Sequence, residues 1–176
     1  MQFKEIIGQE TIKKRFLKMV TENRISHAQL LLGKEGCGKL GLAIAFAQYV
    51  CCTNRQDNDS CGTCPSCRKI EKLVHPDLHF VFPVVRSSKF KQPVSDNYIR
   101  QWRSLVTDSP YFGFNDWLMK MGAENQQAGI FTHESQEIIR KLNLKTYESE
   151  YKIMIIWMPE KMNVVAANKL LKMIEE

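Results

Sequence analysis

The chain has 176 residues, a formal net charge of +6 at pH 7, and a composition that is 44% hydrophobic and 25% charged. This length suits one well-buried domain with a small appended module and argues against two full domains. The composition excludes a disordered or low-complexity chain. The basic charge suits association with nucleic acid but does not demonstrate it.

The periodicity of the apolar residues predicts strands that alternate with helices. In chain order we expect a helix over 11–22, a strand over 27–32, a helix over 39–52, a strand over 78–85, a helix over 132–145, a strand over 151–158 and a helix over 164–175. The run HAQLLL at 27–32 is typical of a strand buried on both faces of a parallel sheet. The helix over 132–145 should be capped near Thr132. This order predicts an α/β fold with a parallel sheet flanked by helices.

An irregular segment, residues 86–130, interrupts this alternation. It mixes basic residues with aromatic ones, namely Lys89, Lys91, Arg100 and Arg103 with Trp102, Tyr111, Phe112, Phe114 and Trp117. Such a mixture suits a nucleic-acid-binding surface. It also suits a helical insert that buries its aromatic side chains on the main domain. We favour the packed insert, and the nucleic-acid surface stays open as the alternative.

The stretch LLLGKEGCGKLGL, residues 30–42, has the form of a phosphate-binding loop between a strand and a helix. Its candidate nucleotide-binding residues are Gly33, Gly36, Gly38, Lys39 and Leu40. In such a loop the glycines let successive backbone N–H groups converge on a phosphate at the helix N-terminus, and the lysine reaches the outer phosphates. ATP or ADP would be the ligand, and the sequence leaves open whether either binds.

Two positions that a hydrolytic P-loop protein needs are altered. Magnesium is held by a Ser or Thr after the loop lysine and by an acidic residue at the end of another strand. Leu40 occupies the first position, and the strand over 151–158 ends in Trp157 and Met158. Glu160 lies after Pro159 and off the strand, where it is a poor substitute. We therefore expect no magnesium, no catalytic residue and no intrinsic ATPase activity.

The chain shows neither a secretory signal at its start nor an apolar run near the roughly 20 residues that span a bilayer. We therefore expect a cytoplasmic protein with no membrane partner. Reduced cysteines in that compartment point to metal binding or chemistry before disulfides.

Three of the six cysteines, Cys61, Cys64 and Cys67, repeat the C-x2-C spacing, and Cys52 is an upstream candidate for a fourth ligand. Four thiolates suit tetrahedral zinc in a closed structural site, where the metal would help a small knuckle to fold. An iron–sulfur cluster is the rival, because its motifs can open with the same spacing. Free thiols are the third possibility. We favour zinc, since Arg68 and Lys69 follow where a ferredoxin motif continues with a further Cys and a Pro.

Several segments together resemble one family. They are IIGQE at 6–10, SHAQLLLGKEGCGK at 26–39, CGTCPSCRKI at 61–70, HPDLHF at 75–80 and ANKLLKMIEE at 167–176. In this combination they resemble the N-terminal ATPase-like domain of bacterial DNA polymerase III clamp-loader subunits. The resemblance implies a P-loop NTPase-like (AAA+) domain over 1–176, truncated at its C-terminal end. It also implies an inserted zinc knuckle over 51–70, held by Cys52, Cys61, Cys64 and Cys67, and a family-atypical insert over 86–130.

Within that family, the losses at Leu40, Trp157 and Met158 are similar to those of delta-prime subunits. The resemblance implies a non-hydrolysing subunit of a DNA-directed DNA polymerase holoenzyme, a nucleotidyltransferase. Its partners would be the gamma/tau and delta subunits and, through the complex, the sliding clamp and primed DNA. The family's trans-acting arginine motif would lie beyond Glu176. Two alternatives stay open: an active gamma/tau-type motor ATPase, and a zinc-knuckle DNA-binding protein with a vestigial P-loop.

Overall fold

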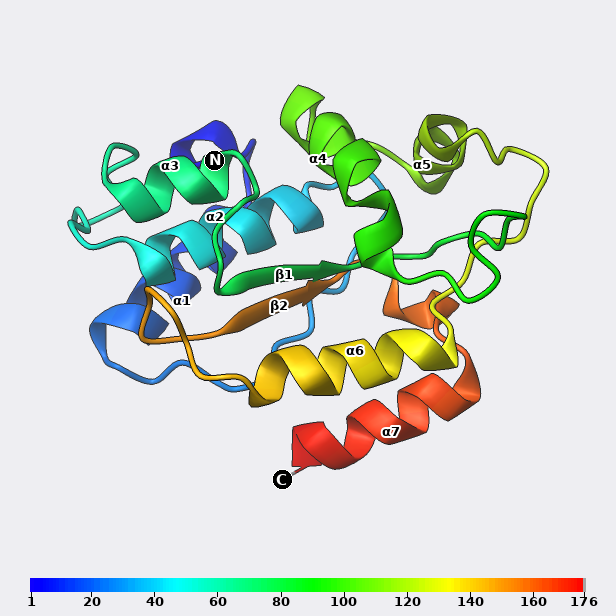
Figure 1. Ribbon diagram of the computed structural model, residues 1–176. Helices are drawn as coiled ribbons and strands as arrows, with labels where there is room; N and C mark the ends of the chain where they lie inside the picture. Colours follow the sequence, from blue (N-terminus) through cyan, green and yellow to red (C-terminus); the bar gives the residue numbers. More distant parts are fainter. Residues whose placement is uncertain (176) are drawn as a thin grey trace. The chain divides into compact units, whose positions relative to one another are not determined.

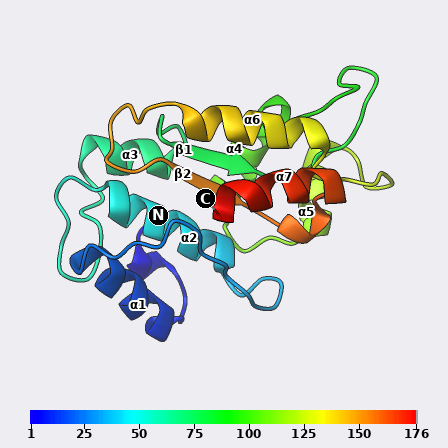
Figure 2. The same ribbon diagram turned by 90° about the horizontal axis from the view of Figure 1, so that it is seen from below.

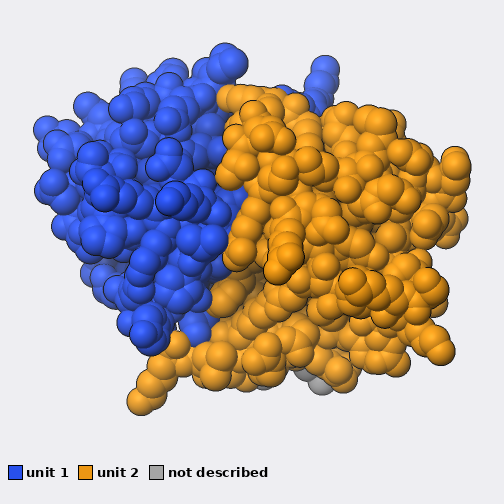
Figure 3. All heavy atoms as spheres, turned by 45° about the horizontal axis from the view of Figure 1, so that its top comes forward, with its two compact units in different colours: residues 1–78, 146–153 blue, residues 79–145, 154–176 orange. Residues whose placement is uncertain are grey.

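The computed structural model describes residues 1–175, with the side chains of 172 and 173 left out. Glu176, which ends the C-terminal motif ANKLLKMIEE, therefore lies outside the described residues. The chain forms two compact units: unit 1 comprises residues 1–78 and 146–153, and unit 2 comprises residues 79–145 and 154–176 (Figure 3). Each unit is described by itself below.

The described helices and strands are α1 (Glu10–Thr21), α2 (Lys39–Cys51), α3 (Pro65–Glu71), β1 (Leu78–Val81), α4 (Ile99–Asp108), α5 (Phe114–Met121), α6 (Thr132–Asn143), β2 (Ile153–Ile156) and α7 (Val164–Glu175) (Figure 1). The predicted helices over 11–22, 39–52, 132–145 and 164–175 are therefore confirmed within two residues at each end. Thr132 is the first residue of α6 rather than its cap, a position that Phe131 takes. Helix α3 was not predicted, because its seven residues are too few to show a helical period.

Unit 1 is built around α2, which contacts α1 and α3 (Figures 1 and 2). Phe16 of α1 stacks on Phe46 of α2 with ring centroids 4.1 Å apart. Phe3 and Ile6, from the chain before α1, join Leu42 and Tyr49 of α2 in the same buried cluster. Leu42 and Tyr49 are seven residues apart, which places them on one face of the helix. This cluster holds the middle of α2, and the two candidate sites lie at the two ends of the helix.

The core of unit 2 is rich in aromatic rings. Trp102 of α4 and Trp117 of α5 have no exposed side-chain surface, and their rings meet edge to face with centroids 5.4 Å apart. Phe82, just after β1, stacks on Trp102 at 4.2 Å. The Trp117 indole N–H donates to the Pro83 carbonyl oxygen over 2.7 Å, so its polar atom is satisfied in the core. The packed-insert interpretation of 86–130 is confirmed for these aromatic side chains.

Helices α6 and α7 lie side by side in unit 2 (Figures 1 and 2). Their buried contacts include Ile138 of α6 and Leu170 of α7, which share a cluster with Ile130 and with Val81 of β1. The Asn163 side chain accepts a hydrogen bond from the Ala166 N–H over 2.8 Å at the start of α7. Its amide N–H₂ group also donates to the Thr132 hydroxyl over 3.2 Å. The starts of α6 and α7 are thereby tied together.

Strands β1 and β2 form a two-stranded parallel sheet, so the expected α/β class with parallel pairing is confirmed (Figure 1). The Ile153 N–H donates to the Asp77 carbonyl oxygen, and four residues later the Trp157 N–H donates to that of Val81, each over 2.8 Å. Both strands are shorter than predicted. Pro83 lacks the N–H that would continue the ladder beyond β1, and Val84 instead forms an isolated antiparallel bridge with Gly129.

The predicted strand over 27–32 is wrong. In the described chain these residues form neither a strand nor a bridge, and the side chains of Leu30 and Leu32 are 70% and 82% exposed. An apolar run supplies strand propensity, but a strand exists only where a second strand takes its backbone hydrogen bonds. That partner is set by the tertiary structure and is not encoded in the run itself.

No helix of the described residues is both long and apolar enough to cross a membrane.

Candidate metal centre and phosphate loop

The four predicted cysteine ligands come from three neighbouring pieces of unit 1. Cys52 follows the last residue of α2, and Cys61 lies in the turn before α3. Cys64 is the N-cap of α3 and Cys67 lies in its first turn. Pro65 stands at the first helical position, where its fixed φ favours the helix start and its missing N–H costs nothing. The C-x2-C spacing thus places two sulfurs on one short helix terminus.

Gly62 makes the turn between Cys61 and Cys64 possible. Its φ of +72° lies in the left-handed region, and a Cβ there would come within 2.9 Å of the Gln2 side chain. The Gln2 side-chain amide itself donates to the Ser60 carbonyl oxygen. The Asp59 carboxylate accepts the backbone N–H groups of Phe3 and Lys4, each over 3.0 Å. The N-terminal segment therefore braces the knuckle.

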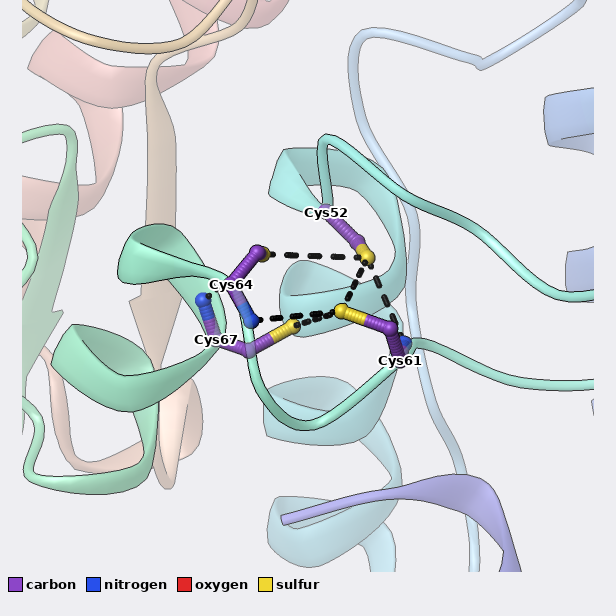
Figure 4. Close-up of side chains that lie close together, drawn as sticks. All are labelled: Cys52, Cys61, Cys64 and Cys67. Carbon is purple, nitrogen blue, oxygen red and sulfur yellow. Dashed lines mark hydrogen bonds between the residues drawn. The ribbon is translucent and has the colours of Figure 1, made fainter.

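The four sulfur atoms point toward one another and all lie within 4.8 Å of each other (Figure 4). The distance from Cys52 Sγ is 3.5 Å to Cys61 Sγ and 4.0 Å to Cys64 Sγ, and Cys61 Sγ lies 3.9 Å from Cys67 Sγ. These separations are far longer than a disulfide bond of about 2.05 Å. Tetrahedral zinc with Zn–S bonds of about 2.3 Å separates its sulfurs by about 3.8 Å. The four cysteines could therefore hold one zinc ion.

Backbone N–H groups already point at the sulfurs. Cys61 N–H donates to Cys52 Sγ and Cys64 N–H to Cys61 Sγ, each over 3.3 Å, and Cys67 N–H donates to Cys64 Sγ over 3.5 Å. The N–H groups of Thr63 and Cys64 lower the pKa of Cys61 to about 6. Burial would raise the pKa of Cys64, but the N–H of Cys67 and the side chain of Thr53 bring it below its usual value. Two ligands are thus predisposed to the thiolate form that binds metal.

The other two thiols have the opposite tendency. Burial raises the pKa of Cys52 and that of Cys67 above the usual thiol range. A divalent cation reverses this preference, because a coordinated thiol loses its proton outright. A cluster of several irons would also have to sit between the thiolates and hold them farther apart than a single ion does. The compact sulfur arrangement favours one ion over the iron–sulfur alternative.

The other two cysteines lie outside this centre. Cys51 is buried beside Ser149, and burial raises the pKa of its thiol to about 11. Cys37 lies in the phosphate loop, where the Lys39 ammonium is 3.7 Å from its sulfur.

The candidate phosphate loop lies at the opposite end of α2 from Cys52. Lys39 is the first residue of α2 and Gly38 is its N-cap, with a φ of +83°; Gly36 has a φ of +73°. Both angles suit glycine. The Lys39 ammonium donates to the carbonyl oxygens of Gly33, over 2.6 Å, and Lys34, over 2.5 Å. The predicted residues Gly33, Gly36, Gly38 and Lys39 are therefore brought together in one loop, which its own lysine closes.

Leu40, the residue after the loop lysine, is buried. Only 6% of its side chain is exposed. The loop borders a hollow of about 370 Å³, which Cys37 and Lys39 line together with Ile12 of α1 and Leu30. Gln9, which also lines the hollow, joins the chain before α1 to the loop, because its side-chain amide donates to the Cys37 carbonyl oxygen over 3.1 Å. The position after the loop lysine thus serves packing and offers the hollow no oxygen.

The end of β2 has a similar structural role in unit 2. The Trp157 ring lies 5.4 Å from that of Trp102 and 5.2 Å from that of Phe112. Met158 adopts a φ of +56°, and the 3-10 turn Pro159–Lys161 follows, so Glu160 lies off the strand as expected. Trp157 and Met158 both lack the carboxylate oxygens that a metal ion would require.

One anchoring residue was missed by the sequence reasoning. The Asp77 carboxylate accepts the backbone N–H groups of Tyr147 and Glu148, each over 2.7 Å, and of Ser149 over 3.0 Å. Burial would raise the pKa of Asp77, but these N–H groups hold it below its usual value. Its neighbour His75 is buried, and its Nδ1 accepts the Asp77 N–H over 3.1 Å. The tripeptide His75-Pro76-Asp77 was the available signal, and its role within unit 1 is structural.

Comparison with known proteins identifies the family. A family model described as "DNA polymerase III, delta subunit" matches residues 8–176. The chain belongs to this DNA polymerase III family. The match covers both the phosphate loop and the cysteine centre.

Individual relatives carry more than one subunit name. DNA polymerase III subunit delta' of Bacillus subtilis is 37% identical over 75 residues, which are 43% of this chain and 22% of that protein. Subunit gamma/tau of Mycobacterium bovis is 25% identical over 171 residues, which are 86% of this chain and 29% of that protein. Subunit gamma of Buchnera aphidicola is 39% identical over 70 residues, 40% of this chain and 19% of that protein. The chain thus spans less than a third of the length of each of these relatives.

Proposed function

We propose that the protein is a delta-prime-type subunit of the DNA polymerase III clamp loader. It helps to assemble the ring that loads the sliding clamp on primed DNA, and it does not hydrolyse ATP itself. The observation that carries this proposal is the position of Leu40, which is 6% exposed and packed in the core. A motor subunit needs a hydroxyl at that position to hold magnesium.

The second missing metal ligand supports the same conclusion. Hydrolysis requires an acidic residue at a strand end, and Trp157 fills that position with a ring packed on Trp102 and Phe112. Neither change leaves an oxygen that could replace the missing ligand. Leu40 is buried and Trp157 packs on two aromatic rings, so each residue has a structural role in place of a metal-binding one. Magnesium chemistry therefore has no protein ligand at either position.

The fold that we propose for the whole chain is a P-loop NTPase-like (AAA+) domain with an inserted knuckle. The parallel pair β1–β2 and the glycine loop at the start of α2 support it. In the knuckle, Cys52, Cys61, Cys64 and Cys67 would hold zinc. The ion would tie the end of α2 to the start of α3, replacing a hydrophobic core that so short a module cannot build.

The partners that we propose follow from the family. They are the gamma/tau and delta subunits and, through the complex, the sliding clamp and primed DNA, in the cytoplasm. The test is reconstitution: the purified chain is mixed with gamma/tau and delta subunits and the products are separated by size-exclusion chromatography with light scattering. We expect a stoichiometric complex. Failure of the zinc-loaded chain to enter any complex would overturn the proposal.

A gamma/tau-type motor is the second candidate function. The 171-residue match to the Mycobacterium bovis gamma/tau subunit favours it, because it covers 86% of this chain. This candidate predicts turnover of ATP that falls when Lys39→Ala removes the loop ammonium. The delta-prime proposal predicts no turnover in either form, so an ATPase assay on this matched pair separates the two candidates.

A further inference from the structure

Unit 2 contains a hollow with basic side chains, which lies between the insert over 86–130 and the start of α6. A hollow of about 300 Å³ is lined there by Arg86, Lys91, Gln92, Pro93, Phe131 and His133. Two of these side chains carry a permanent positive charge, and His133 adds a third basic group. Trp102, Phe112 and Trp117 of the insert are buried together in another part of unit 2. Arg86 and Lys91 do not belong to that core, so packing does not explain why basic residues line the hollow.

The hollow has no negative charge of its own. Within residues 1–175, neither Arg86 nor Lys91 forms an ion pair with a carboxylate. The nearest acids along the chain are already engaged. The Asp96 carboxylate pairs with the Lys141 ammonium at 2.7 Å, and the Glu134 carboxylate accepts the Ser95 N–H over 2.6 Å. The two cations therefore face an open hollow with no acidic side chain to compensate them.

The arginine is held in place by its neighbours. The Arg86 guanidinium carbon lies 4.7 Å from the centre of the Phe131 ring, a cation–π contact. The two chain segments that carry Arg86 and Phe131 are joined by the antiparallel bridge between Val84 and Gly129. In this bridge the N–H of each residue donates to the carbonyl oxygen of the other over 3.0 Å. Binding then requires less ordering of the side chain, which favours affinity.

The loop that carries Lys91 is also structured. The Ser87 N–H donates to the Phe90 carbonyl oxygen, and the Phe90 N–H donates to the Ser87 hydroxyl, each over 3.0 Å. The Phe90 ring meets the Tyr98 ring edge to face with centroids 5.7 Å apart. The Tyr98 hydroxyl in turn donates to the Val85 carbonyl oxygen over 3.0 Å. The two walls of the hollow are thus built by hydrogen bonds and ring contacts within unit 2.

We propose that this hollow binds a phosphate group, with Arg86 and Lys91 as its principal ligands. A guanidinium matches two phosphate oxygens with paired N–H donors, and a lysine adds a compact positive charge. The one aromatic ring in the hollow, Phe131, already carries Arg86 on its face, so the site does not stack a base. Recognition is therefore of the phosphate and independent of sequence. The phosphate comes from a nucleic-acid backbone or from a free nucleotide.

The experiment measures binding of a fluorescent single-stranded 20-mer to the full chain by anisotropy, over a series of salt concentrations. Arg86→Ala/Lys91→Ala is expected to weaken binding about tenfold or more. It should also flatten the plot of log K against log salt by about 0.7 for each phosphate group that the variant no longer neutralises. Lys89→Ala is the matched control. Lys89 lies in the same loop and is exposed, but its ammonium rests over the Phe90 ring and does not line the hollow.

Competition identifies the source of the phosphate. Displacement of the 20-mer by ATP or inorganic phosphate in the wild type, but not in the double variant, assigns the site to free phosphate species as well. Arg86→Lys keeps the charge and is expected to restore most of the salt dependence. The proposal is overturned if the double variant and Lys89→Ala bind every probe alike while both melt at the wild-type temperature. That result would leave complex formation with the other subunits untouched, so the failure of this inference is distinguishable from failure of the proposed function.

Discussion

The two ends of α2 carry two sites that differ in how complete they are. At its C-terminal end, Cys52 joins three other cysteines in a centre whose four sulfurs lie within 4.8 Å of one another. At its N-terminal end, the phosphate loop keeps its glycines and Lys39, but Leu40 is packed in the core. One site has four sulfurs that could hold a zinc ion, and the other has the glycines and lysine of a phosphate loop but no oxygen ligand for magnesium at Leu40. The difference shows that the shape of a phosphate loop alone does not predict ATP hydrolysis, whereas a complete set of four sulfurs does predict metal binding.

The largest effect should come from breaking the cysteine centre. We expect Cys64→Ser to lower the free energy of unfolding by about 4–5 kcal/mol, because it removes a ligand of a structural metal. Chelation of zinc from the wild type should have the same effect. Cys37→Ser is the control, since Cys37 lies in the phosphate loop and outside the sulfur cluster. Denaturant unfolding with elemental analysis measures both, and equal stability of the two variants would contradict the zinc site.

The next effect concerns the other end of α2. Leu40→Thr restores the hydroxyl of a working loop but removes buried apolar volume, so we expect a decrease of about 2–4 kcal/mol in unfolding free energy. ATPase activity should stay absent, since Trp157 and Met158 still offer no carboxylate. Leu40→Met keeps the volume and should cost less than about 1.5 kcal/mol. Measurable turnover in Leu40→Thr alone would contradict the account of the two missing ligands.

A smaller effect is expected from pH, which should change the zinc affinity of the cysteine centre. Protons compete with zinc for the thiolates, and the pKa of Cys61 is about 6. Zinc affinity should therefore fall throughout the range from pH 8 to pH 5, because Cys52 and Cys67 have raised pKa values and must release protons to bind zinc. The fall should steepen below about pH 6, where Cys61 also takes up a proton, by up to about tenfold per pH unit for each proton. A competition assay with a chromophoric chelator at pH 5, 6, 7 and 8 measures it. Affinity that stays constant across this range would mean that the thiolates are not the ligands.

The smallest effect is expected at the loop lysine. Lys39 donates hydrogen bonds to the carbonyl oxygens of Gly33 and Lys34 at an accessible position, so Lys39→Ala should change the free energy of unfolding by less than about 1.5 kcal/mol. Isothermal calorimetry of the wild type and Lys39→Ala with ADP should show whether the Lys39 ammonium also binds a nucleotide. A large decrease in stability would show that the loop is held by this lysine more strongly than its hydrogen bonds predict.

Local sequence signals predicted most of the helices and the cysteine ligands. Helices α1, α2 and α7 have apolar residues at a helical period, and the C-x2-C spacing predicted three of the four clustered sulfurs, because neighbouring residues are placed by the local chain. Cys52 was only an upstream candidate from the spacing, and the family resemblance assigned it. The strand over 27–32 failed because its hydrogen-bond partner is not local. The role of Asp77 was missed for the same reason, since the N–H groups that it accepts lie about 70 residues away along the chain.

The insert shows the limit of composition as a guide. Its mixture of basic and aromatic residues allowed either a packed helical segment or a nucleic-acid surface. The structure separates the two kinds of residue: Trp102 and Trp117 are buried, whereas Arg86 and Lys91 line a hollow. A helical period was available for Trp102, because Trp102 and Val106 of α4 lie four residues apart and are both buried. Arg86 and Lys91 lie outside the described helices and strands, so no period could have placed them beside the hollow.

We propose that the chain combines a structural zinc centre with a phosphate loop that does not hydrolyse ATP. The most direct test is the steady-state ATPase rate of the zinc-loaded protein with magnesium and primed DNA, measured beside Lys39→Ala. The account predicts that both proteins show only the background rate. Turnover in the wild type that Lys39→Ala abolishes would contradict it.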